Sequence, residues 1–188
     1  MIKITERGIE GTAMEKFGYI KRRTGIGRVV LPITGYLRTI NTEKYIKEGE
    51  RLLDIGCGDG YFIKRSKCWE RYGMDKLLGD EVTDHLDFPD AHFDYVTMLA
   101  VIEHISDPTQ ICKEIHRVLK PGARFVFTTP KQSAEWIINL YVKNIEEEHE
   151  AYFDLERVKG MAGDLFEVVG HHTFIFGLNQ VFCLERKN

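Results

Sequence analysis

Apolar runs of strand length alternate with stretches of helical pattern along most of the chain. Four runs predict strands, at residues 51–55, 72–75, 93–100 and 124–129, and the first and third are apolar enough to be buried. Between the last two runs, apolar residues recur at the spacing of one helix face: Ile111, Ile115, Val118 and Leu119. Strands that alternate with helices in this way predict an α/β fold with a doubly wound sheet.

Capping and turn residues indicate where further elements begin and end. Asp107 followed by Pro108 predicts the start of a helix, and Pro121-Gly122 predicts its end. The remaining expected elements are helices at 60–67, at 133–144 and from Asp154 onward, and two strands at 165–176 and 180–185 joined by a turn.

The chain before the first strand follows a different pattern. Apolar residues show a short helical pattern after Thr12 and again over 36–47, with Pro32 and several glycines interrupting between them. We therefore expect residues 1–49 to form an N-terminal helical cap on a core of residues 50–188. One domain, residues 1–188, is expected from the length.

The segment from Asp75 to Phe93 is short for its place in such a fold. A strand, a crossover helix and a return strand need a dozen or more residues in the crossover alone. We expect a shortened third β-α unit here, with a very short strand around residues 81–83.

Composition narrows the classes of function. The chain has 188 residues, 43% of them hydrophobic, and its formal charge of −3 gives no overall basic field of the kind that binds nucleic acid. Residues 1–47 are basic, with ten Lys or Arg against four Glu, which indicates either a solvated segment or a basic wall for an anionic substrate. The four cysteines lie far apart and indicate neither a metal site nor a disulfide framework. Without an apolar run of spanning length or a signal pattern, we expect no membrane span and a cytoplasmic location.

The stretch 52–62 carries the strongest chemical signal. It is an apolar strand, then a turn with Gly56, Gly58 and Gly60, then the opening of a helix. Glycine lets a ligand approach the main chain closely, and a helix N-terminus attracts a carboxylate or a phosphate. Asp54 at the strand end suits a cation. Together these features predict a pocket for a zwitterion such as an amino-acid head group.

The same residues resemble motif I of the class I S-adenosylmethionine (SAM)-dependent methyltransferases. Asp54 to Gly60 matches the pattern (D/E)-x-G-x-G-x-G, whereas dehydrogenases carry G-x-G-x-x-G. Three further runs resemble the family in the right order: F-D-x-V at 93–96, E-H at 103–104 and R-V-L-K-P-G at 117–122. The resemblance covers about 51–129 and, more loosely, the rest of the chain to Arg186. It implies a Rossmann-like, mostly parallel sheet with an antiparallel last strand, SAM as cofactor, and S-adenosyl-L-homocysteine as product.

The resemblance also implies roles for individual residues. Residues 56–60 are expected to cradle the methionine and the ribose, and Asp54 to face the amino group through water. Asp75, the acid at the end of the second strand, is expected to accept hydrogen bonds from both ribose hydroxyls. The adenine contact is assigned to Asp84, with Asp80 as the alternative. The full set of expected cofactor-binding residues is Asp54, Gly56, Cys57, Gly58, Gly60, Asp75, Lys76, Asp84, Leu99 and Ala100.

Methyl transfer from a sulfonium is an in-line displacement, so the protein mainly aligns the acceptor and removes its proton where necessary. His104 and His149 are the candidates for a catalytic base. No N-P-P-[YF] motif follows the strand at 93–100, which disfavours methylation of DNA bases. The expected acceptor is a small molecule or a lipid-like precursor.

Two other functions use similar sequence features. An NAD(P)-dependent oxidoreductase would use the same type of sheet, but the glycine spacing opposes it. A SAM-binding module without catalysis is the second alternative. The sequence leaves the oligomeric state open.

Overall fold

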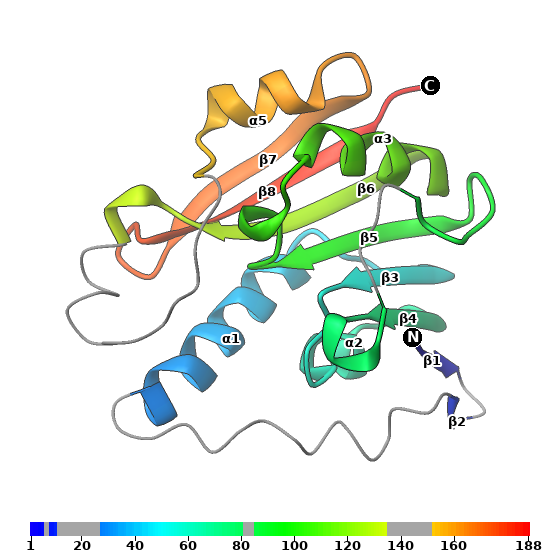
Figure 1. The fold of residues 1–188 in the computed structure, drawn as a ribbon, viewed down its shortest axis with the longest axis horizontal. Helices are drawn as coiled ribbons and strands as arrows, with labels where there is room; N and C mark the ends of the chain where they lie inside the picture. The colour runs from blue at the N-terminus through cyan, green and yellow to red at the C-terminus, as the bar shows by residue number, and fades with distance from the viewer. Residues whose placement is uncertain (6–7, 11–26, 81–84, 135–151) are drawn as a thin grey trace.

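The computed structural model describes residues 1–5, 8–10, 27–80, 85–134 and 152–188. Within these residues the centre of the fold is an eight-stranded sheet with the strand order β2-β1-β4-β3-β5-β6-β8-β7 (Figure 1). The strands are β1 (Ile2–Thr5), β2 (Gly8–Glu10), β3 (Arg51–Ile55), β4 (Glu70–Met74), β5 (Phe93–Leu99), β6 (Leu119–Pro130), β7 (Phe166–Phe174) and β8 (Asn179–Arg186).

Four neighbouring strands, β4, β3, β5 and β6, are parallel to one another. The strand β8 then pairs antiparallel with β6, and β7 pairs antiparallel with β8. The expected α/β fold and the antiparallel last strand are therefore confirmed. The sheet as a whole is mixed, because β1 and β2 add two antiparallel pairs beside β4.

Helices cover both faces of the sheet. They are α1 (Gly27–Glu43), α2 (Tyr61–Arg65), α3 (Pro108–Val118) and α5 (Leu155–Ala162), with single 3-10 turns at η2 (Lys76–Leu78), η3 (Ile102–His104) and η4 (Gln132–Ala134). Figure 1 shows α3 and α5 on one face and α1 on the other. The starts of α3 and α5 agree with their capping signals. The Asp107 carboxylate accepts hydrogen bonds from the amides of Thr109 and Gln110. The Asp154 carboxylate accepts one from the amide of Arg157.

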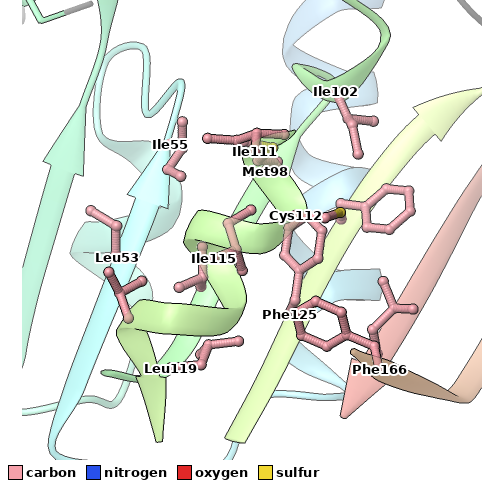
Figure 2. Packing of buried hydrophobic residues seen from close by; sticks show 14 of the residues in the cluster. Leu53, Ile55, Met98, Ile102, Ile111, Cys112, Ile115, Leu119, Phe125 and Phe166 are labelled. Atoms are coloured by element: carbon pink, nitrogen blue, oxygen red, sulfur yellow. The ribbon is translucent and has the colours of Figure 1, made fainter. Parts of the chain in front are cut away.

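The main core lies between the sheet and the helices α3 and α5. Figure 2 shows Ile111, Cys112 and Ile115 of α3 beside Met98 and Phe125 of the sheet. All five side chains are at most 3% exposed. Because burying apolar area is the main stabilising term in folding, this contact fixes α3 on the sheet and with it the carboxyl ends of β5 and β6.

The helical cap expected for 1–49 is wrong for residues 2–5 and 8–10, which pair as the antiparallel strands β1 and β2 instead. Ile2 and Ile4 alternate with polar residues and are 0% and 6% exposed. A period of two lets both isoleucines face the core from one strand, which a helix would not allow. The helical segment expected after Thr12 lies outside the described residues.

The helix α1 also departs from expectation, because it begins at Gly27 rather than at residue 36 and contains Pro32 and Gly35. Pro32 stands in the second turn, where it removes one intrahelical hydrogen bond near a helix end. The loss is local, so the helix continues to Glu43. The short strand expected around 81–83 and most of the helix expected at 133–144 lie outside the described residues.

Candidate functional site

The glycine turn connects β3 to α2 at the carboxyl edge of the parallel strands. Gly56, Gly58 and Gly60 have φ angles of 76°, 53° and 71°, a region that residues with side chains rarely adopt. A Cβ atom on Gly56 would stand 2.2 Å from a methyl carbon of Val101, whereas one on Gly58 would meet nothing within 4 Å. Gly56 is thus required by packing inside the protein, while the main chain at Gly58 borders open space that a ligand fits.

Hydrogen bonds tie this turn to the end of β4. The amides of Gly56 and Cys57 donate to the carbonyl oxygen of Met74 over 2.7 and 3.0 Å, and the amide of Gly58 donates to Asp75 Oδ2 over 2.8 Å. The structure therefore brings the glycine turn and the acid of the second parallel strand together, as expected from the sequence. Their contacts with a cofactor stay a prediction.

Asp54 is a buried carboxyl group below the turn. It is 2% exposed, and the hydroxyl of Thr97 on β5 donates to its Oδ1 over 2.7 Å. Burial raises the pKa of Asp54 to about 7, the Thr97 hydrogen bond opposes the rise, and the charge of Asp75 adds to it. A cation bound nearby would favour the charged carboxylate, so the site suits an ammonium group.

Cys57 is placed differently from its neighbours in the turn. Its side chain is 7% exposed and packs toward β4, where a Cβ on Gly73 would stand 2.8 Å from its sulfur. Burial raises the pKa of the Cys57 thiol above its ordinary value. A ligand above the turn would meet the main chain of Cys57 rather than its thiol.

The end of β5 forms the next part of the site. Leu99 is half-buried, and Ala100 has a φ of 58° while its amide donates to the carbonyl oxygen of Thr128 over 2.9 Å. A positive φ outside glycine is uncommon and tends to occur at functional sites. It turns the chain from β5 into η3, where His104 is half-buried.

Glu103 on η3 is the residue that sequence reasoning treated only as part of a motif. It is 1% exposed, and its Oε2 atom has no hydrogen-bond partner among the described residues. Burial raises the pKa of Glu103, against the effects of the Arg38 charge and a hydrogen bond with Thr129. The sequence signal that could have singled out Glu103 is an acidic residue in an apolar stretch that includes Val101 and Ile102.

The other expected site residues fall into two groups. Lys76 is exposed on η2, and Asp80 next to it has a carboxylate that accepts from the Asp75 amide over 3.3 Å. Asp84 and His149 lie outside the described residues.

Among the described residues no group of three or more His, Cys, Asp or Glu is arranged to hold a metal ion. In that same part of the chain, no helix has the length and apolar character to cross a membrane.

Comparisons with known proteins identify the family of the chain. The family described as "Methyltransferase domain" matches residues 33–165. A sterol 24-C-methyltransferase of Pneumocystis carinii is 30% identical over 138 residues, which are 59% of this chain and 34% of that protein. A ubiquinone biosynthesis O-methyltransferase of Alkalilimnicola ehrlichii is 29% identical over 128 residues, which are 51% of this chain and 52% of that protein. The chain thus spans about a third to a half of the length of these relatives.

Among solved structures, a SAM-dependent methyltransferase from Aquifex aeolicus superposes with a TM-score of 0.62 at 17% sequence identity, covering 92% of this chain and 97% of that one. At this identity the superposition shows that the fold is shared. The family match extends from α1 to the residue before β7 and includes the glycine turn, Asp75 and the E-H turn. The chain therefore belongs to the methyltransferase-domain family.

Proposed function

We propose that this protein transfers a methyl group from SAM to a small-molecule or lipid-like acceptor. The observation that carries the proposal is the hydrogen bond from the Gly58 amide to Asp75, beside open space above Gly58. It holds a strand-end carboxylate next to a bare main chain, which is how this type of fold binds a nucleoside.

In this proposal, different residues of the site bind different parts of the cofactor. One oxygen of Asp75 is oriented by the Gly58 amide, and the carboxylate accepts from the ribose hydroxyls. Asp54 attracts the amino group of the methionine end, and the residues from Leu99 to Ala100 lie against that end. When bound, SAM supplies a methyl group on a sulfonium, which leaves as the neutral thioether of S-adenosylhomocysteine.

The acceptor site belongs at the carboxyl ends of β5 and β6, where η3 follows. His104 and His149 are our candidates for removing a proton from an acceptor hydroxyl or amine. The relatives named for methylating a sterol carbon and for ubiquinone biosynthesis support a small or lipid-like acceptor. All four cysteines are free and buried, which supports a reducing, cytoplasmic location.

Calorimetry and a turnover assay test the proposal in two steps. The protein is titrated with SAM, S-adenosylhomocysteine and NADH, and we expect binding of the first two and none of the third. It is then incubated with SAM and a panel of phenols, amines and sterols, and release of S-adenosylhomocysteine is measured. Binding of NADH alone would overturn the proposal at the first step, and cofactor binding without turnover on any acceptor class would favour a module that binds SAM without catalysis.

A further inference from the structure

The strand β1 occupies a place that a doubly wound sheet usually gives to its third strand. In such sheets the order is 3-2-1-4-5, and the third strand lies beside the second. Here β1 pairs with β4, which is the second parallel strand, and does so antiparallel, with Ile2 opposite Gly73 and Ile4 opposite Arg71. Ile2 and Ile4 pack into the apolar cluster that also contains Leu52. The N-terminal strand is therefore built into the sheet.

The antiparallel direction brings the start of β1 to the cofactor edge. Ile2 pairs two residues before Asp75, so Met1 lies beside the turn that Asp75 opens. This turn is closed by main-chain bonds from Leu78 and Asp80 to the carbonyl oxygen of Asp75, over 2.9 and 3.2 Å.

Asp80 connects the two segments. Its Oδ2 accepts from the Asp75 amide over 3.3 Å, and its Oδ1 accepts from the Met1 nitrogen over 2.8 Å. Each oxygen of Asp80 thus accepts a hydrogen bond from within the protein. Its geometry suits a brace between β1 and the residue that faces the ribose.

The apolar side chains beside this brace suit a purine. Met1 is 47% exposed at the start of β1, and Leu78 is half-buried against the same cluster as Ile2. A purine ring is flat and largely apolar, and the flexible thioether of methionine makes favourable contacts with aromatic rings.

We propose that residues 1–5, together with Asp80, form one wall of the nucleoside subsite and hold Asp75 in its binding position. The ligand class is a purine nucleoside, as in S-adenosylhomocysteine. This inference rests on the proposed function and adds that β1, which pairs with β4 in the sheet, takes part in the nucleoside subsite. Asp80 is a positioning residue in this scheme, because it acts through Asp75.

The test compares two probes that share the nucleoside. S-adenosylhomocysteine carries both ends of the cofactor, and methylthioadenosine carries the nucleoside without the amino-acid end. Their dissociation constants are measured for the wild type, for Asp80→Ala, for a variant that lacks residues 2–5, for Asp54→Asn, and for Asp164→Ala. Asp164 is an exposed carboxylate before β7 and serves as the matched control.

We expect Asp80→Ala and the deletion to weaken both probes by the same factor, on the order of tenfold, which corresponds to about 1.4 kcal/mol. Asp54→Asn should weaken only S-adenosylhomocysteine, because methylthioadenosine has no amino group for it to hold. Asp164→Ala should leave both constants unchanged. Should the deletion variant fail to fold, as judged by circular dichroism, Asp80→Ala decides alone.

Two outcomes would overturn the proposal that residues 1–5 and Asp80 form a wall of the nucleoside subsite. One is unchanged affinity of Asp80→Ala for both probes, and the other is a loss confined to S-adenosylhomocysteine. Failure of the proposed function looks different, because the wild type itself would then bind neither probe.

Discussion

At the scale of single residues, the candidate site depends on a few groups with unusual surroundings. The sequence singled out Asp54 and the glycines as candidates, because a strand end and a tight turn leave a strong pattern in the sequence, and the family resemblance added Asp75. It could not show that Asp54 is buried against Thr97 or that the Cys57 side chain points away from the turn, since both depend on packing between strands far apart in sequence.

Asp75→Ala tests the ribose contact. The change removes two charge-assisted hydrogen bonds, each worth roughly 1.5 to 3 kcal/mol, so S-adenosylhomocysteine should bind at least tenfold more weakly. Asp75→Asn is the milder comparison, because its carbonyl oxygen still accepts from the Gly58 amide. Isothermal calorimetry measures both, and an Asp75→Ala variant with wild-type affinity would remove this residue from the site.

Gly58→Val tests the close approach of the ligand to the main chain. The valine would fill the open space above the turn, so cofactor binding should disappear. It also adds a backbone cost of about 1–2 kcal/mol, because φ is 53° at this position. Gly122→Val is the matched control, since Gly122 has a φ of 73° and open space around it but lies at the start of β6, at the opposite end of the strands. If both variants fold and bind equally well, the ligand lies elsewhere.

Asp54 predicts a dependence on pH. Its folded pKa, about 7, exceeds the unfolded value, so the ligand-free fold binds more protons than the unfolded chain between about pH 4 and pH 7. This group's contribution to stability is therefore present at low pH and is lost as pH rises through 7. Asp54→Asn should raise the urea midpoint of the ligand-free protein at pH 8 and leave it nearly unchanged at pH 4, while weakening S-adenosylhomocysteine at pH 8. A midpoint that falls at pH 8 would contradict the assignment.

At the scale of elements, the helices and strands with strong local sequence signals were predicted well. The elements that depend on tertiary pairing or packing were not. The capped helices α3 and α5 and the strands from β3 to β8 were expected near their observed places. The strand β1 was missed because Ile-Lys-Ile-Thr is too short to be a signal by itself and becomes a strand through pairing with β4. The helix α1 was placed too late because Pro32 and Gly35 are interrupting signals that tertiary packing outweighs.

A polar contact between α1 and β7 provides a test at this scale. His172 Nδ1 lies 3.0 Å from the Tyr45 hydroxyl and its Nε2 lies 2.8 Å from Asn41 Oδ1, so the neutral ring accepts from tyrosine and donates to asparagine. Lys44 also donates to Asn41 Oδ1, and Gly170 leaves room for the Tyr45 ring, which a Cβ there would approach to 2.4 Å.

Burial, and then the charges of Lys44 and His171, lower the pKa of His172. The neutral form is favoured in the fold, so this contribution to stability is present above the unfolded pKa near 6.5 and is lost as pH falls through the lower folded value. His172 therefore contributes a loss of stability between pH 7.5 and pH 5.5, whereas Asp54 contributes a gain over the same interval. When the free energy of unfolding in urea is measured at both pH values, its change from pH 7.5 to pH 5.5 should be more favourable to the fold in His172→Gln than in the wild type. Burial also lowers the pKa of His116. The variant His116→Gln therefore shows how much of the remaining pH dependence of stability comes from that histidine. An unchanged slope in His172→Gln would contradict the assignment.

At the scale of the whole molecule, the site joins β3, β4 and β5 at one edge, so a ligand there should stabilise the entire domain. At a hundred times its dissociation constant, S-adenosylhomocysteine should add about 2.7 kcal/mol. For a domain of this size that raises the melting temperature by roughly 5–10 °C. Differential scanning calorimetry measures the shift, which should shrink in Asp75→Ala. A shift of equal size in both proteins would place the ligand away from β4.

The pairing of β1 and β2 with the sheet also determines which fragment of the chain can be expressed as a stable fold. The family match ends at residues 33 and 165, but β1 and β2 precede these limits, and β7 and β8 follow them. An expression fragment trimmed to 33–165 would leave β4 and β6 as two bare edges, with unpaired amides and carbonyls and with Phe182 and Leu184 missing from the core. Bare edges of buried strands pair with other copies, so this fragment should accumulate as aggregate in the cell while the longer chain does not.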